Sequence, residues 1–123
     1  MFPAMTRPPF TKAADGELID CPWGKLWWFA SGKLGNSQTM TFGRTILKAG
    51  CENPVHRHPN CDEILHVISG KIAHTLADEE FVLEAGDTLC IPAGVWHHAR
   101  ALGADDADLV ICFSSPNRET EFA

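Results

Sequence analysis

Hydrophobic and polar positions alternate along this chain in a series of short runs that are separated by turn-forming residues. Such runs, rich in β-branched and aromatic residues, predict strands. Predicted strands cover residues 17–20, 25–31, 38–47, 63–69, 71–77, 80–84, 88–91, 96–101 and 108–114. Pro, Gly, Asn and Asp fill the intervals between them. No segment repeats its apolar residues every 3.6 positions, so we expect an all-β sandwich or barrel.

The alternation also predicts which side chains share a face. Successive residues of a strand point to opposite sides. Glu63 therefore shares a face with Leu65, and His66 points the other way. By the same rule, His97 and His98 face opposite sides of their strand.

Length and composition indicate one domain. The chain has 123 residues, of which 45% are hydrophobic and 21% charged, values that are ordinary for a globular protein. Residues 1–16 are rich in proline and carry no pattern, so we expect an extended arm. Residues 17–115 form the predicted β domain, and residues 116–123 are expected to be a solvated tail.

Charge and apolar content exclude two kinds of partner. A net charge of −6 and a pI near 5.4 argue against nucleic acid, because no basic stripe is present. No apolar run reaches the length needed to span a membrane. The N-terminal residues lack the apolar core of a secretory signal, and the five cysteines are an odd number. We therefore expect a cytoplasmic protein with free thiols.

Candidate metal ligands cluster between Gly50 and Gly70. His56, His58 and Glu63 lie within this stretch, and His56 and His58 can share one face of a strand. Two imidazoles and a carboxylate suit a divalent first-row transition metal. A fourth ligand must come from elsewhere, and the sequence Trp-His-His at residues 96–98 offers one.

The spacing of these residues resembles the two motifs of the cupin family. The first motif is matched by Gly50, His56, His58, Glu63 and Gly70, and the second by Gly86, Pro92, Gly94 and His97. The second motif ends in Asn in the family, and Ala101 replaces it here. This replacement removes a hydrogen-bonding amide from that corner of the site.

The resemblance implies a fold and a metal site. The fold would be a single cupin barrel, also called a jelly roll or double-stranded β-helix, over residues 17–115. It implies that His56, His58, Glu63 and His97 hold one divalent ion of Fe, Mn, Ni, Cu or Zn. It does not imply one reaction, because one fold hosts many activities.

Three further residues are candidates for the cavity, each with an alternative. Arg44 interrupts an apolar face and either anchors a substrate carboxylate or lies on the outer surface. His74 either enters the cavity or sits in the apolar layer. Cys61 is two residues from Glu63 and either approaches the metal or is an ordinary loop cysteine.

Two classes of function remain open. The first is an enzyme acting on a small organic molecule, in the form of a dioxygenase with three His and one Glu or of a metal-dependent isomerase or sugar-modifying enzyme. The second is a small-ligand binding or sensing module without turnover. The chain has no tyrosine, which excludes a phenolic acid or base. Exposed strand edges and the apolar residues 27–29 favour a homodimer.

Overall fold

Strands form most of the regular structure in residues 9–123, the part of the chain that this computed structural model describes. A short 3-10 helix, η1 (Ala13–Asp15), precedes them. The strands are β1 (Glu17–Cys21), β2 (Gly24–Ala30), β3 (Thr41–Leu47), β4 (His56–Arg57), β5 (Glu63–Ser69), β6 (Lys71–Leu76), β7 (Glu79–Glu84), β8 (Thr88–Ile91), β9 (His97–Leu102), β10 (Ala107–Phe113) and β11 (Glu121–Phe122). Within these described residues, no helix is both long and apolar enough to cross a membrane.

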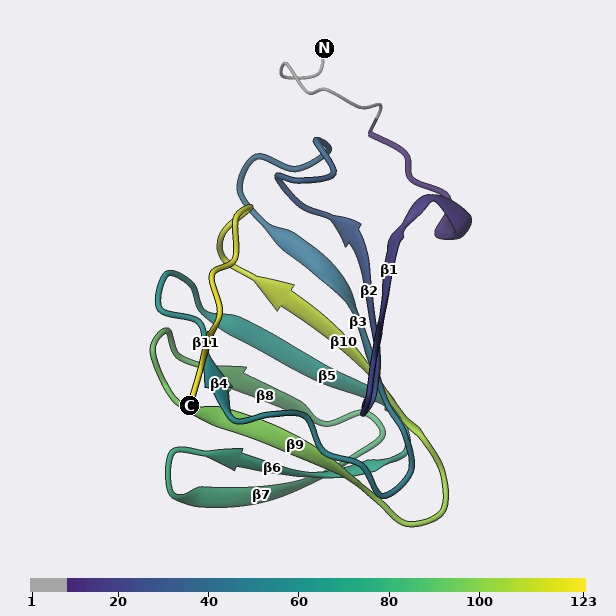
Figure 1. Cartoon of the computed structure of the whole chain (residues 1–123), viewed down its shortest axis with the longest axis vertical. Helices are drawn as coiled ribbons and strands as arrows, with labels where there is room; N and C mark the ends of the chain where they lie inside the picture. The colour runs from purple at the N-terminus through teal and green to yellow at the C-terminus, as the bar shows by residue number, and fades with distance from the viewer. Residues whose placement is uncertain (1–8) are drawn as a thin grey trace.

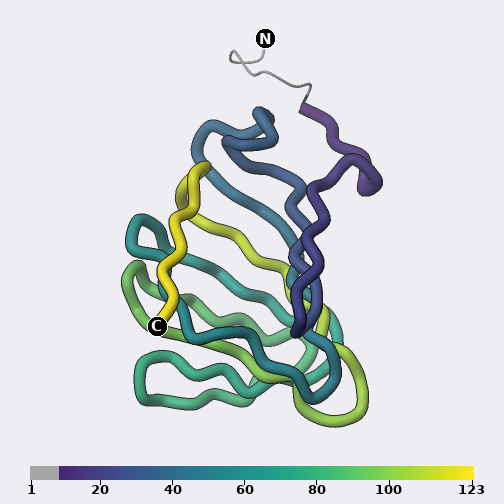
Figure 2. Tube along the Cα trace, viewed as in Figure 1, coloured from purple at the N-terminus to yellow at the C-terminus, as the bar shows by residue number. Residues whose placement is uncertain are grey.

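Two antiparallel sheets make up the barrel (Figure 1). The six-stranded sheet has the order β1-β2-β3-β10-β5-β8, and the five-stranded sheet has the order β11-β4-β9-β6-β7. Both sheets pair strands that are far apart in sequence, as in β3 with β10 and β4 with β9. The arrangement confirms the all-β barrel that the sequence predicts. Figure 2 shows the C-terminal segment running back beside the chain that leads out of β4.

The core lies between the inner faces of the two sheets. Leu65, Val67, Leu109 and Ile72 are almost fully buried and belong to one apolar cluster. Full burial of such a side chain contributes roughly 1.5–3 kcal/mol. Glu63 and Leu65 are buried whereas His66 is partly exposed, which confirms the predicted alternation along β5.

Gly43 allows one aromatic ring to reach this core. A Cβ at Gly43 would lie 2.6 Å from Cε3 of Trp28 and 2.5 Å from the carbonyl oxygen of Trp27. No side chain larger than hydrogen fits such a close approach. Trp28 therefore packs across β3 into the interior, and Trp27 points to the outer face beneath Arg44.

Three expectations differ from the structure. Residues 116–123, expected to be a solvated tail, include β11, which pairs with β4 and extends the five-stranded sheet, while Glu121 and Phe122 remain exposed. The apolar runs 88–91 and 108–114 predict core positions for Cys90 and Cys112, but the two residues flank Ile64 across the six-stranded sheet, and Cys90 is exposed. The N-terminal arm falls partly outside the described residues, and its described part contains η1.

Candidate metal centre

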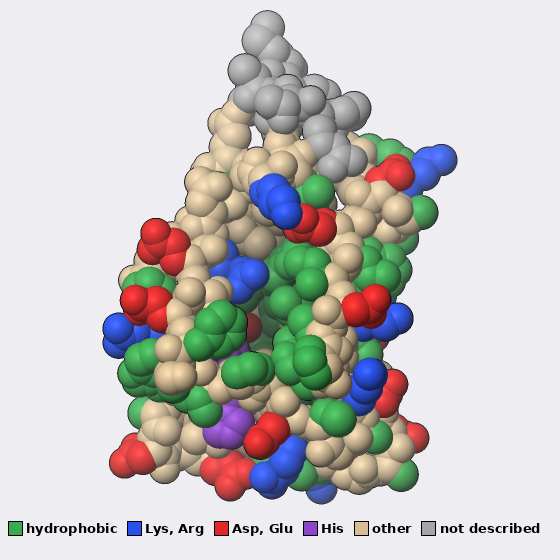
Figure 3. Space-filling view, viewed as in Figure 1, with side chains coloured by type: hydrophobic (Ala, Val, Ile, Leu, Met, Phe, Trp, Pro, Cys, Tyr) green, Lys and Arg blue, Asp and Glu red, His purple; other side chains and the backbone are tan. Residues whose placement is uncertain are grey.

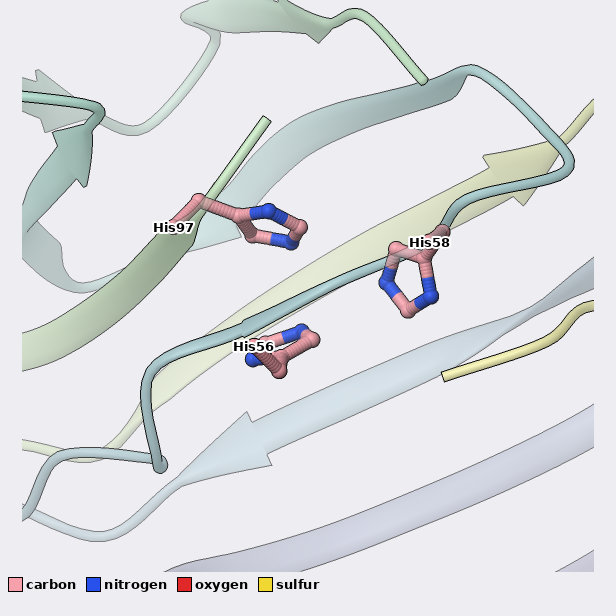
Figure 4. Close-up of side chains that lie close together, drawn as sticks. All are labelled: His56, His58 and His97. Atoms are coloured by element: carbon pink, nitrogen blue, oxygen red, sulfur yellow. The ribbon is translucent and has the colours of Figure 1, made fainter. Parts of the chain in front are cut away.

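Three histidines converge at one end of the barrel (Figure 4). His56 in β4 is paired directly with His97 at the start of β9, and His58 follows β4 by one residue. One ring nitrogen from each of the three lies within 4.8 Å of the others. Two strands from the same sheet therefore supply three imidazoles to a single point.

Each of these rings is anchored by its other nitrogen to a main-chain carbonyl. Nδ1 contacts the carbonyl oxygen of Pro54 for His56 (2.7 Å), of Glu119 for His58 (2.9 Å) and of Val95 for His97 (2.9 Å). A carbonyl oxygen only accepts hydrogen bonds, so we assign the proton to Nδ1 in all three rings. Each Nε2 is then left with a free lone pair.

Glu63 adds a carboxylate beside two of these rings. Its Oε1 lies 3.3 Å from Nε2 of His97 and 3.4 Å from Nε2 of His58. Oε1 of Glu63 and Nε2 of His97 are buried and have no hydrogen-bond partner in the described chain. With the assigned tautomers, electron-pair donors face one another with no proton between them. Such a set fits a divalent transition metal.

The charge states agree with this fit. Burial alone would raise the pKa of Glu63, but hydrogen bonding and charge from His58 and His97 lower it to about 2. That effect requires a proton on the Nε2 atoms that face Glu63, and a bound metal ion would take the place of that proton. Burial, reinforced by the neighbouring His97, lowers the pKa of His56 to about 4. Neutral imidazoles and an ionised carboxylate are the metal-binding forms of these side chains.

His74 lies directly behind the site. Its ring stacks on that of His97, with centroids 5.6 Å apart, and its side chain is fully buried. Burial and the proximity of His97 lower the pKa of His74 to about 4. The sequence left two positions open for His74, in the cavity or in the apolar layer. The structure places it in the apolar layer, against the back of the site.

A cavity of about 400 Å³ opens beside the metal centre, and His56, His58 and Glu63 form part of its wall. Most of the remaining wall is apolar, including Trp23, Leu26, Trp28, Ile111 and Phe113. Figure 3 shows hydrophobic side chains gathered around a hollow on this face of the molecule. The volume lies within the range of small-molecule sites.

Two of the sequence candidates lie elsewhere. Arg44 is on the outer face of the six-stranded sheet, where its guanidinium pairs with Asp108 through two hydrogen bonds. It therefore cannot anchor a substrate in the cavity. Cys61 is buried in the apolar core cluster and is not part of the group of candidate ligands. Parity alone could not place Arg44, because its partner is 64 residues away in sequence.

Ala101, the departure from the family motif, faces the core. It is buried among apolar side chains, and its amide nitrogen donates to the carbonyl oxygen of Cys51. The methyl group leaves no polar atom unsatisfied there. This substitution therefore leaves the candidate ligand set unchanged.

Sequence reasoning missed the contribution of the C-terminal segment. Arg118 and Thr120 line the cavity, and the carbonyl group of Glu119 orients His58. Burial lowers the pKa of the Arg118 guanidinium, and the nearby Glu63 carboxylate opposes that change. The one available signal is the Pro116-Asn117 pair, whose turn chemistry predicts a chain reversal after the last long strand.

The sequence is similar to germin-like proteins and oxalate oxidases. A germin-like protein of Oryza sativa subsp. japonica is 32% identical over 85 residues, which cover 65% of this chain and 38% of that protein. Oxalate oxidase GF-2.8 of Triticum aestivum is 29% identical over 90 residues, covering 67% of this chain and 40% of that protein. The chain thus spans about two fifths of the length of these relatives.

Solved structures share the fold at lower identity. An oxalate decarboxylase of Bacillus subtilis has a TM-score of 0.81 and 23% identity, with coverage of 89% of this chain and 30% of that chain. An oxalate decarboxylase of Lactobacillus farciminis has a TM-score of 0.82 and 20% identity, with coverage of 89% and 34%. The family model of the cupin domain matches residues 43–113, which is more than half of the sequence. With both motifs, the barrel and this match in agreement, the chain belongs to the cupin family.

Proposed function

We propose that this protein is a metal-dependent enzyme that transforms a small organic molecule in the cavity beside the three histidines. The observation that carries the proposal is the convergence of three imidazole nitrogens, with the Glu63 carboxylate beside two of them, at the wall of the cavity. A molecule in the cavity can reach that point because His56, His58 and Glu63 are part of the lining. The germin-like proteins and oxalate oxidases that resemble this chain support an assignment within the same broad class.

The side chains of the site have distinct roles in this proposal. A divalent transition metal held by His56, His58, Glu63 and His97 would supply Lewis-acid or redox chemistry. The ionised carboxylate of Glu63 would reduce the net charge of the metal site by one. The main-chain carbonyls hold the imidazoles in their metal-binding tautomer. The apolar wall excludes water from the substrate.

Within this class we propose a dioxygen-dependent oxidation of the dioxygenase type. Among the described residues that line the cavity, Asp20 and Glu63 are the only carboxylates, and Glu63 is a candidate ligand. No tyrosine exists anywhere in the chain. Side-chain acid–base groups are therefore few, which favours chemistry driven by the metal. The resemblance to proteins named oxalate oxidases supports the same choice.

Oxygen consumption tests this proposal directly. Protein purified without oxygen would be loaded separately with Fe(II), Mn(II) or Zn(II) and mixed with catechols, enols, keto acids and oxalate in an oxygen electrode. We expect uptake with a redox-active metal and none with zinc. Equal turnover with zinc under strict anaerobiosis would instead identify a Lewis-acid isomerase or sugar-modifying enzyme. Ligand binding without turnover by any metal form would identify a binding module.

We also infer that the protein is a homodimer, with a second copy on the outer face of the six-stranded sheet. Phe42, Cys112 and Ile64 are aligned across β3, β10 and β5 on that face. Phe42 and Ile64 are exposed, as is Ile68 farther along β5. Contiguous exposed apolar residues of this kind mark interaction surfaces, and a self-complementary patch suits a twofold dimer.

A further inference from the structure

Arg118 occupies an unusual position on the wall of the cavity. It lies in the C-terminal segment, outside the residues 43–113 that match the family model. Its guanidinium carbon is 4.4 Å from the ring centroid of Trp28 and 5.2 Å from that of Phe113. Its Nη1 donates a hydrogen bond to Oγ1 of Thr120 at 2.7 Å. The group is therefore held between two rings and one hydroxyl.

Arg118 forms no ion pair at contact distance with any described carboxylate, although Glu63 is near enough to act on its pKa. The other described arginines each have a carboxylate within 4.0 Å, in the pairs Arg44–Asp108, Arg57–Glu121 and Arg100–Glu80. No carboxylate of residues 9–123 forms such a pair with Arg118, and residues 1–8 contain neither Asp nor Glu. Taking a cation partly out of water costs free energy unless it is paired. Stacking on Trp28 offsets only part of that cost.

Most N–H donors of Arg118 have no hydrogen-bond partner among the described residues. A guanidinium carries five N–H donors, and one of them is accounted for by Thr120. Arg118 lines both the main cavity and a second cavity of about 290 Å³, which also share Trp28. A ligand in the main cavity therefore meets a cation whose planar fork is still available.

We propose that Arg118 binds the carboxylate of the substrate, and that the substrate is an organic acid with an apolar body. This inference rests on the proposed function, because it takes the main cavity as the substrate site. A planar guanidinium matches a carboxylate with two parallel hydrogen bonds. A cavity of about 400 Å³ with Trp23, Leu26 and Ile111 in its wall leaves room for an apolar body, which a small dicarboxylate would not fill.

Arg118 would bind that carboxylate close to the histidines. Oγ1 of Thr120 accepts from Arg118 and also lies 3.2 Å from Nδ1 of His58. One hydroxyl group therefore separates the cation from an imidazole of the candidate metal centre. A substrate anchored at Arg118 places its adjoining carbon atoms beside Glu63 and His58, where we propose that the reaction occurs.

Ligand titration followed by tryptophan fluorescence tests the proposal, since Trp23 and Trp28 line the cavity. The full chain loaded with zinc would be titrated with phenylacetate, 3-phenylpropanoate and 4-phenylbutyrate, and with the neutral amide of each acid. The variants are Arg118→Gln, Arg118→Lys and the matched control Arg100→Gln, whose arginine pairs with Glu80. Repeating the titrations on metal-free protein separates binding at Arg118 from direct binding to the metal.

We expect wild type and Arg100→Gln to prefer at least one acid over its amide. Arg118→Gln should bind that acid about 10–100-fold more weakly and lose the preference, because one partner of a charged hydrogen-bonded pair is gone. Arg118→Lys should fall between the two. These differences should persist without metal. Thermal unfolding would verify that the variants are folded; if Arg118→Gln does not fold, Arg118→Lys and the acid–amide comparison in wild type decide the matter.

Three results would overturn the proposal: equal affinity of wild type and Arg118→Gln for the acid, amides binding as well as acids, or no binding of any acid by wild type at millimolar concentration. Its failure is distinguishable from failure of the proposed function. Metal-dependent turnover that is unchanged in Arg118→Gln would refute only the role of Arg118. Acid binding that depends on Arg118, without turnover by any metal form, would refute only the proposal that the protein is an enzyme.

Discussion

Three imidazoles in this protein are each oriented by a hydrogen bond from Nδ1 to a main-chain carbonyl. These hydrogen bonds decide what the cluster can bind. Each Nδ1 faces a main-chain carbonyl, so each Nε2 lone pair points toward the other two rings. In His56 burial lowers the pKa to about 4, which keeps the ring neutral at pH 7. Neutral imidazole is the form that binds metal. The side chains are therefore arranged for an ion before one arrives.

Removing one imidazole should empty the site without unfolding the barrel. We expect His58→Ala to lose stoichiometric metal, with a fall in affinity exceeding the roughly 10–100-fold loss typical of an outer-shell partner. The matched control is His66→Ala, because His66 lies on the outer face of the other, six-stranded sheet and contacts Thr88. Elemental analysis after gel filtration measures both. Full metal content in the His58→Ala variant would refute the ligand assignment.

His74 should make the metal-free protein sensitive to mild acid. Its pKa is lowered to about 4 in the folded chain, against about 6.5 when unfolded. The unfolded chain binds more protons in this window, so the free energy of unfolding falls as pH drops from 6.5 toward 4. Between pH 7 and 5 the loss should be on the order of 2 kcal/mol for this group. The lowered pKa of Glu63 acts only below its unfolded value of about 4.5, outside that interval.

Urea unfolding of metal-free protein at several pH values measures this dependence. We expect His74→Leu to lose distinctly less stability than wild type between pH 7 and 5, because it removes one of two histidines with a lowered pKa that the unfolded chain protonates in this window. The other is His56, whose contribution remains in both proteins. His66→Leu, on the outer face, should keep the slope of wild type. Parallel curves for wild type and His74→Leu would show that His74 does not govern the acid response.

At the scale of elements, the C-terminal segment shows which strands the local alternation of apolar and polar residues cannot predict. The nine longer strands follow alternation along the chain, and the sequence places them within a few residues of their true bounds. β4 and β11 have two residues each and no period to detect. They form because Phe122 pairs with His56 and Glu121 pairs with Arg57, and Glu121 and Arg57 are 64 residues apart in sequence. Only the tertiary structure contains that information.

Deleting this segment should weaken metal binding, because the segment supplies a main-chain carbonyl that orients one of the histidines. Removal of residues 116–123 takes away the Glu119 carbonyl that orients His58. We expect metal affinity to fall about 10–100-fold, as for other outer-shell partners, while the core in β2, β3, β5, β6 and β10 stays folded. Glu119→Ala is the matched control, since it keeps the carbonyl and should bind metal normally. Competition with a chelator measures affinity; an unchanged affinity in the truncated chain would contradict the role of the segment.

At the scale of the whole molecule, the spacing of the two motifs was enough to place the candidate ligands together. His56 and His97 are neighbours across β4 and β9 although 41 positions separate them. Arg44 and Arg118 could not be placed in the same way. Arg44 faces outward because Asp108 sits beside it on β10, and Arg118 reaches the cavity because the chain reverses after β10. Motif spacing encodes the shared site, whereas these two positions depend on contacts particular to this chain.

The outer face of the six-stranded sheet carries the last prediction. A charge introduced at Ile64, which is 50% exposed at the centre of the apolar patch, would be desolvated when two copies associate. We expect wild type to sediment as a dimer and Ile64→Glu as a folded monomer. Val82→Glu, on the exposed strand β7 of the other sheet, should remain dimeric. Sedimentation velocity over a range of concentrations measures the assembly. A wild-type monomer at every concentration, or an Ile64→Glu variant as dimeric as wild type, would rule out this face as the interface between subunits.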